Sequence, residues 1–189
     1  MKINKLFGSL FLAGAILSSC APALKEVSYW DARSTLTPSY QSPYNTVKIT
    51  GTFSTETEGE KETIKIDSTF KIKGEKVIDG YRSFVKSDVA AASVFGVTIA
   101  NLNSVYSAQK ITPKYYIGTG DVSVVSKIDV RQWGLLSGTA TYVINELKGV
   151  YEYNNYGLLL SADEYQETTQ NDVKTITSVK ASLKYSTIL

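Results

Sequence analysis

The chain contains no histidine and only one cysteine among its 189 residues. Without histidine it can build neither a Ser-His-Asp nor a Cys-His nucleophile system, and no zinc or haem site that uses a histidine ligand. With one cysteine it can form neither an internal disulfide nor a metal site of several cysteines. Most hydrolase and metalloenzyme classes are therefore excluded, and the apolar core alone must hold the fold together.

A charge excess of either sign is also missing. The chain has 20 Lys+Arg and 18 Asp+Glu, and loss of the first 19 residues would remove Lys2 and Lys5, which leaves 18 of each sign. The lysines between residues 61 and 73 are interleaved with acidic residues. Because no basic stripe is visible, we expect no nucleic-acid partner.

Residues 1–19 have the pattern of a bacterial signal peptide. Lys2 and Lys5 precede an apolar run over 6–17, and Ser18-Ser19-Cys20 follows. Twelve residues of helix span about 18 Å, which is too short for the roughly 30 Å hydrocarbon core of a bilayer. We therefore expect this segment to be cleaved and not to serve as a membrane span.

The only cysteine lies at the end of this signal. Leu17-Ser18-Ser19-Cys20 resembles a bacterial lipobox, in which the cysteine thiol receives a diacylglycerol group and becomes the mature N-terminus. The resemblance implies that acyl chains on Cys20 anchor the protein in a membrane. An Asp after the cysteine would resemble the inner-membrane retention signal of enteric bacteria. Because Ala21 stands there instead, the resemblance implies the outer membrane, and we expect the domain to face the periplasm. The alternatives are an ordinary secretory signal and a buried core cysteine.

The mature chain begins with a tether and continues as one domain. Residues 20–45 contain three of the four prolines and are interpreted as a lipidated tether, with room for a short helix between Leu24 and Leu36. Residues 46–189 form the domain. Apolar and polar residues alternate over 47–54 and 63–73, which predicts an antiparallel hairpin around the polar loop 55–62.

Further strands follow from the same alternation. Residues 173–185 predict the longest strand. A polar loop is expected over 163–172, a short helix over 88–92, and other strands over 77–86, 97–100, 104–106, 115–117, 150–153 and 156–161. Apolar residues are spaced unevenly near 122–148, which predicts a helical insert. This order predicts a mainly β (α+β) fold, a curved antiparallel sheet or half-barrel covered on one face by short helices.

Four short motifs in the second half of the chain carry a family resemblance. They are Gly96-Val97-Thr98-Ile99-Ala100, Asn103-Ser104-Val105-Tyr106, Lys114-Tyr115-Tyr116-Ile117-Gly118 and Leu135-Leu136-Ser137-Gly138. In this order they resemble a family of uncharacterised Bacteroidota outer-membrane lipoproteins that is similar to the LolA/LolB lipoprotein carriers. The resemblance implies a strongly curved half-barrel with helices on its concave side and a hydrophobic cargo.

If the strands curve in that way, their apolar residues form one concave face. The candidate ligand-binding residues on it are Ile49, Phe53, Ile66, Phe70, Leu183 and Tyr185, with Val47, Ile64, Ile72, Val179 and Ala181 continuing the face. Small Gly51 and Ser68 are expected to leave room between them. The expected ligand is an acyl chain, a lipid or a lipoprotein, bound without a cofactor.

Two other groups of residues leave alternatives open. Trp133, Leu135 and Leu136 could contact a membrane or cargo, although core packing is the preferred interpretation. The chain also has 13 tyrosines, which suit half-exposed strands but also docking surfaces. The alternative function is therefore a non-catalytic structural or assembly module that docks on an outer-membrane protein complex.

Acidic residues give no indication of an enzyme. Four glutamates in 56–62 are interpreted as a solvated hairpin tip, because a calcium loop needs Asp or Asn at alternating positions. The carboxylate pairs available for acid and base roles are Asp163 with Glu164 and Asp121 with Asp129. All four lie in polar sequence contexts, so we expect ordinary ionisation, no catalysis and no metal.

Overall fold

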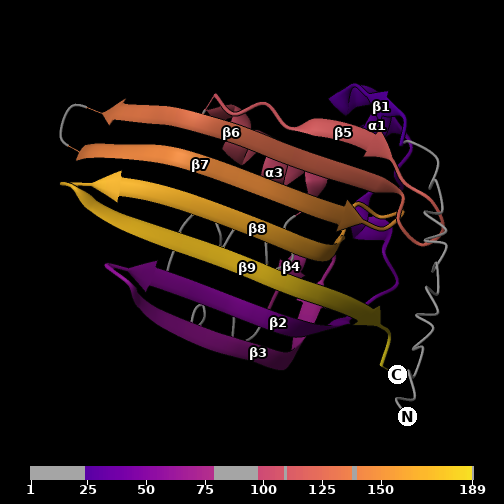
Figure 1. The fold of residues 1–189 in the computed structure, drawn as a ribbon. Coiled ribbons are helices and arrows are strands. Elements are labelled where there is room, and N and C mark those ends of the chain that lie inside the picture. The colour runs from indigo at the N-terminus through magenta and orange to yellow at the C-terminus, as the bar shows by residue number, and fades with distance from the viewer. Residues whose placement is uncertain (1–23, 79–97, 109, 138–139, 189) are drawn as a thin grey trace, which may run out of the picture.

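The structure, a computed structural model, describes residues 24–78, 98–108, 110–137 and 140–188 (Figure 1). The predicted signal peptide, Cys20, the predicted helix over 88–92 and most of the predicted strand over 77–86 lie outside these residues.

One open, curved antiparallel sheet dominates the described residues. Its nine strands lie in the order β1-β5-β6-β7-β8-β9-β2-β3-β4. The strands are β1 (Glu26–Val27), β2 (Thr46–Thr57), β3 (Glu60–Lys73), β4 (Lys76–Val77), β5 (Lys114–Ile117), β6 (Val124–Ser137), β7 (Ala140–Tyr153), β8 (Leu159–Gln170) and β9 (Val173–Ser186). The predicted fold class, a mainly β domain with a curved antiparallel sheet and short helices, is confirmed.

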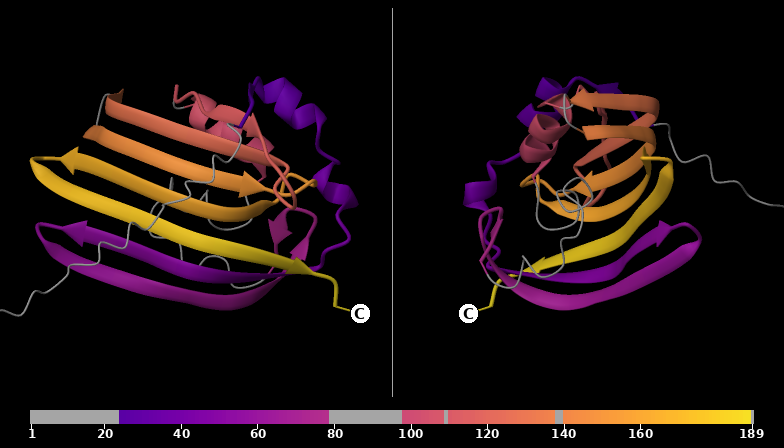
Figure 2. Two further views of the ribbon diagram at one scale, coloured as in Figure 1. Left: turned by 45° about the vertical axis from the view of Figure 1, so that its right-hand side comes forward. Right: turned by 90° about the vertical axis from the view of Figure 1, so that its left-hand side faces the viewer.

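Short helices accompany the sheet on its concave side and at one end. They are α1 (Tyr29–Ser34), the 3-10 turn η1 (Ser39–Gln41) and α3 (Ile99–Ala108). Figure 2 shows α3 on the concave side, which we call the inner face, and α1 beside β5 at one end of the sheet. The expected short helix between Leu24 and Leu36 is α1, and the Ser28 side chain accepts a hydrogen bond from the Asp31 amide at its start.

The predicted hairpin of the first two long strands is confirmed as β2 and β3. Their register is unbroken from Thr46 opposite Lys71 to Thr57 opposite Glu60. Glu58 and Gly59 form the turn with φ of 53° and 85°, the positive values that two-residue hairpin turns require. The loop is shorter than the predicted 55–62 because cross-strand pairing continues to the turn.

The predicted last strand is also confirmed and occupies a central place. β9 pairs with β8 on one side and with β2 on the other, where Thr46 lies opposite Ser186. Within the described sheet, the hairpin near the start of the domain therefore pairs with the later hairpins through β9.

The prediction of a helical insert near 122–148 is wrong. These residues form most of β6 and β7, which pair from Val124 opposite Tyr153 to Ser137 opposite Ala140. Val125 and Ile128 lie on opposite faces of β6, and both are buried. Because β6 carries apolar Val125 on its outer face and buried, polar Ser126 on its inner face, the alternation of apolar and polar residues that identifies a strand is lost there.

The predicted strands over 97–100 and 104–106 are wrong for the residues that the structure describes there, since α3 begins at Ile99. The Thr98 hydroxyl accepts a hydrogen bond from the Asn101 amide at 3.2 Å, as a helix N-cap does. Ile99, Leu102 and Tyr106, spaced by three and four residues, are at most 1% exposed and form the face of α3 that packs in the core.

The predicted polar loop over 163–172 is mostly strand. β8 continues to Gln170, and its turn with β9 consists of Asn171 and Asp172, both with positive φ. Outward-facing acidic residues of β8 pair with lysines of β9, as Asp163 does with Lys180 at 3.2 Å. Cross-strand pairs of opposite charge stabilise a sheet, so a polar segment can form a strand.

Candidate functional site

The structure brings the predicted ligand-binding residues together on the inner face. Phe53 lies opposite Ile64 on β3 and opposite Val179 on β9, and residues directly opposite each other share a face. Buried members of this set, between 0% and 8% exposed, are Val47, Ile49, Phe53, Ile66, Phe70, Ile72, Val179, Ala181 and Leu183, while Ile64 and Tyr185 are half-buried. Their role in ligand binding remains a prediction.

Gly51, expected to leave room for a ligand, has a different structural role. A Cβ atom added to Gly51 would lie 2.1 Å from the carbonyl oxygen of Lys180 and 2.8 Å from the Cα atom of Ala181. Glycine is therefore needed because the backbones of β2 and β9 approach closely at this point. The space left by the absent side chain of Gly51 is therefore occupied by the backbone of β9.

A buried carboxylate lies in the middle of the inner face. Glu164 on β8 is 1% exposed and sits in register between Gly149 on β7 and Val179 on β9. Its Oε2 atom accepts hydrogen bonds from the hydroxyl of Tyr151 and, at 3.3 Å, from that of Tyr106. The two hydroxyl oxygens are 3.1 Å apart. We call Tyr106, Tyr151 and Glu164 the Glu164 cluster.

A glycine allows this cluster to form. An added Cβ at Gly149 would lie 2.4 Å from the Tyr151 Oη atom and 2.6 Å from two atoms of its ring. The Tyr151 ring therefore lies along the sheet over Gly149, and its hydroxyl reaches the carboxylate directly opposite Gly149 on β8. α3 supplies the third member, Tyr106, and so ties this helix to the sheet.

The electrostatics of the cluster favour hydrogen-bond donation by both tyrosines. Burial, followed by the charge of Glu164, raises the pKa of Tyr106 and of Tyr151 well above the ordinary value of 10.0. Both phenols therefore stay protonated at neutral pH and remain donors. The cluster fixes α3 on the sheet and offers no phenolate for nucleophilic chemistry.

Three further buried polar atoms lie on the inner face on either side of Glu164, from β6, β7 and β8. Within the described part of the chain, no hydrogen-bond partner is found for Ser126 Oγ, Tyr153 Oη or Gln166 Oε1. Burial raises the pKa of Tyr153 well above 10.0. The interior is thus apolar over β2, β3 and β9 and more polar over β6, β7 and β8.

The expectation of polar surroundings is wrong for one of the four candidate carboxylates. Asp163 is exposed on the outer face and Glu164 is buried on the inner face, because adjacent strand residues point to opposite sides. Asp129 is exposed opposite Lys148, and Asp121 is exposed in the turn between β5 and β6. The structure therefore does not assemble the carboxylate pairs considered from the sequence.

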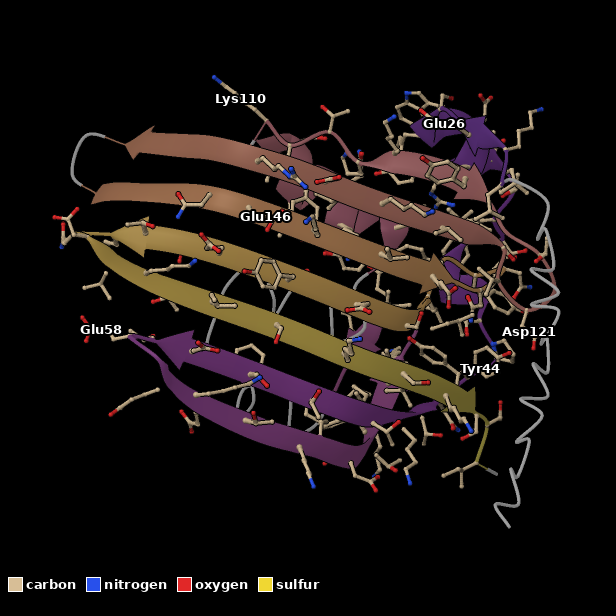
Figure 3. The ribbon with its side chains drawn as sticks, viewed as in Figure 1. Glu26, Tyr44, Glu58, Lys110, Asp121 and Glu146 are labelled. Carbon is tan, nitrogen blue, oxygen red and sulfur yellow. The ribbon has the colours of Figure 1, made fainter. Side chains whose placement is uncertain are left out.

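A pocket of about 550 Å³ opens at the end of the inner face. Its lining includes Leu183 and Tyr185 from the predicted set, together with Tyr44, Asp121 and Asn154. Tyr44 contacts the ring of Tyr185, with 5.7 Å between centroids, and the Tyr185 hydroxyl donates to the Leu159 carbonyl at 2.7 Å. Figure 3 shows Tyr44 and Asp121 at this end of the sheet and Glu58 at the opposite end.

The glutamates of the β2–β3 tip do not share one face. Glu56 lies opposite Lys61, and Glu62 lies opposite Thr55 on the other side of the hairpin. Among the described residues, no three His, Cys, Asp or Glu side chains are grouped so that they could hold a metal ion.

For the remaining candidate residues predicted from the sequence, the structure describes either the backbone alone or nothing. Trp133, Leu135 and Leu136 belong to β6, with Leu135 opposite Tyr142, and their side chains are outside the description. Cys20 precedes the described residues. No helix in the part that is described has the length and apolar composition needed to cross a membrane.

Comparison of the chain with protein-family models, with curated proteins and with solved structures finds no match.

Proposed function

We propose that this protein is a lipid-anchored, non-catalytic binding protein of the outer membrane that faces the periplasm. It holds an acyl chain, a lipid or a lipoprotein against the inner face of its sheet, in the manner of a LolB-like carrier in envelope biogenesis. The observation that carries the proposal is the aligned apolar inner face of β2, β3 and β9, which ends at the pocket beside Leu183 and Tyr185.

The size of the pocket and the apolar inner face beside it suit a ligand that is mostly hydrophobic. The pocket volume of about 550 Å³ falls in the usual range of small-molecule sites. A chain of ten to fifteen methylenes placed on the inner face would gain about 8–12 kcal/mol from burial, before ordering costs. The pocket lining combines the rings of Tyr44 and Tyr185 with polar groups such as Asp121, Asn154 and Lys184, which suits a ligand with one polar end.

Anchoring is tested by changing the predicted lipidation site. Cys20→Ser should release the protein from the membrane fraction, and the circular dichroism of the domain should remain that of a folded β protein. A Ser variant that still sediments with membranes would overturn the lipid-anchored part of the proposal.

Ligand binding is tested on the chain from Ala21, which lacks the lipid. Native mass spectrometry should detect co-purified fatty acid or phospholipid, and Phe70→Asp or Phe53→Asp should remove it. Thr69→Asp is the matched control, because Thr69 is exposed on the outer face next to Phe70. Phe70→Ala provides a milder change if the Asp variant does not fold.

Ligand-free protein from several preparations, without binding of a fluorescent fatty acid, would contradict the carrier function. That result would favour the assembly module, because the side chains of the inner face are buried in one cluster with other parts of the chain. Native mass spectrometry of one protein sample distinguishes bound lipid, which the carrier requires, from ligand-free protein, which the assembly module predicts.

A further inference from the structure

Large exposed apolar side chains gather at one end of the sheet. Six are exposed among the described residues, and the four most exposed are Trp30 at 75%, Tyr40 at 77%, Ile78 at 60% and Ile188 at 61%. The other two, Val150 and Val173, are 41% and 37% exposed. The first four belong to α1, to η1 and to the residues directly after β4 and β9.

Hydrogen bonds place η1 and the residues after β4 and β9 side by side. The Ile188 amide donates to the Asn45 side chain at 2.8 Å, and the Asn45 carbonyl accepts from the Ile72 amide at the end of β3. η1 joins the same region, since the Ser39 hydroxyl donates to Glu75 in the β3–β4 turn at 2.7 Å. Figure 2 (left) shows α1, η1 and the end of β9 along one side of the molecule, which we call the α1 end.

Trp30 is not required by the packing of its own helix. α1 packs through Ala32, which is fully buried, and the Tyr29 ring lies 5.5 Å from that of Tyr115. The Trp30 ring touches only the edge of Tyr29 among the described aromatic contacts and remains three-quarters exposed. Exposed Trp and Tyr are typical of protein surfaces at the membrane–water interface, where an apolar ring with a polar atom fits best.

The short segment between Cys20 and the first described residue limits how far the fold can lie from the membrane. Cys20 is four residues before Leu24, the first described residue. Four residues span at most about 14 Å even when fully extended. If Cys20 carries the lipid, as proposed above, the start of the fold must stay within this distance of the membrane surface.

We propose that the α1 end docks on the phospholipid headgroup layer that holds the Cys20 lipid, with Trp30 inserted at the interface. The lysines exposed at the end of β3 and on β4, Lys71, Lys73 and Lys76, suit anionic headgroups on the same side. The lipid then attaches the protein, and the α1 end sets its orientation. The pocket lined by Tyr44 and Tyr185 lies at this end, where Figure 3 shows Tyr44, so this orientation brings the pocket near the membrane.

The test uses the full lipidated chain in vesicles of phosphatidylethanolamine and phosphatidylglycerol. The chain has two tryptophans, so Trp133→Phe leaves Trp30 as the reporter, and Trp30→Phe leaves Trp133. Trp30 emission should shift to shorter wavelength on reconstitution and lose intensity when brominated phospholipid is present. Trp133, in the half of β6 farther from the α1 end, should show neither change.

Matched tryptophan replacements on β9 extend the test. In a chain without Trp30 and Trp133, Ile188→Trp should be quenched by brominated lipid, and Val173→Trp, at the opposite end of the strand, should not. Mass spectrometry of the same sample reports the lipid on Cys20. Unquenched Trp30 on a lipidated chain would overturn the docking surface alone, and a chain without lipid would overturn the anchor and the surface together.

Discussion

At the scale of single residues, the Glu164 cluster depends on Gly149, because the Tyr151 ring occupies the space that a side chain at this position would fill. Gly149→Ala would force the Tyr151 ring away from its place over β7. We expect a loss of about 1–3 kcal/mol in the free energy of unfolding, the usual cost of overpacking a core. Urea unfolding measures this loss.

A double-mutant cycle controls for effects unrelated to the Tyr151 ring. Gly149→Ala combined with Tyr151→Ala should cost clearly less than the sum of the two single changes, because the clash is already removed. Additive costs would contradict the contact.

The hydroxyl of Tyr151 has a separate role, because it donates to a buried carboxylate. Tyr151→Phe should destabilise the protein by about 1–3 kcal/mol, since the buried Glu164 loses a donor. Tyr165→Phe is the control, because that hydroxyl donates at 3.1 Å to the more accessible Glu167 and should contribute only about 0.5–1 kcal/mol. Equal losses in the two variants would show that burial of the acceptor does not matter.

The sequence predicted the apolar residues of the inner face but not the buried carboxylate. Ile49, Phe53 and Leu183 alternate with polar neighbours, and period two is the direct signature of a strand with one buried face. Glu164 stands between Asp163 and Tyr165, which point to the other face of β8. Both faces therefore carry polar residues, and the sequence does not indicate which face of β8 is buried. That information comes from the register with Val179, more than ten residues away in sequence.

At the scale of elements, α3 begins at a polar cap that can be tested. Thr98→Ala should cost about 1 kcal/mol in the free energy of unfolding because the Asn101 amide loses its acceptor. Thr98→Ser keeps the hydroxyl and should restore most of this stability. Urea titration of the two variants makes the comparison, and equal stability of both would argue against the cap.

Elements were predictable where one face alone is buried. β3 and β9 meet this condition, and β2 meets it except at Thr46 and Ser54, which are buried on the outer face. All three strands were predicted with nearly their observed limits.

β6 departs from this condition near its start, where Val125 on the outer face is as buried as Ile128 on the inner face. β7 buries one face from Leu147 to Tyr153, but Val150 is exposed on its outer face and Gly149 lies on its inner face, so apolar and polar residues do not alternate in the sequence.

α3 has only a few apolar residues at helical spacing. The N-cap residue Thr98 is a local helix signal, and it does not affect the alternation of apolar and polar residues from which strands were predicted.

At the scale of the whole molecule, buried tyrosines make stability depend on alkaline pH. Burial raises the pKa of Tyr106, Tyr115, Tyr151, Tyr153 and Tyr185 in the folded state above 10.0, the value expected when unfolded. Above about pH 10 the unfolded chain therefore binds fewer protons, and stability falls as pH rises. Each such tyrosine should contribute a slope of about 1.4 kcal/mol per pH unit there.

Tyr153 separates this effect from hydrogen bonding. Its hydroxyl lacks a partner among the described residues, so Tyr153→Phe should leave stability at pH 7 unchanged or raised. The same variant should show a smaller loss between pH 8 and pH 11, measured by urea unfolding. A large loss at pH 7 would contradict the assignment of this hydroxyl.

The position of β9 between β2 and β8 has a consequence for the time course of folding. Thr46 must find Ser186 across 140 positions of sequence before the two parts of the sheet can join. Such distant pairing is slow because the chain entropy is lost before the contacts form. Until then β2 and β3 are only a hairpin, which is marginally stable in water. A newly made chain therefore keeps its first two long strands without a stable partner until β9, the last strand, has been made.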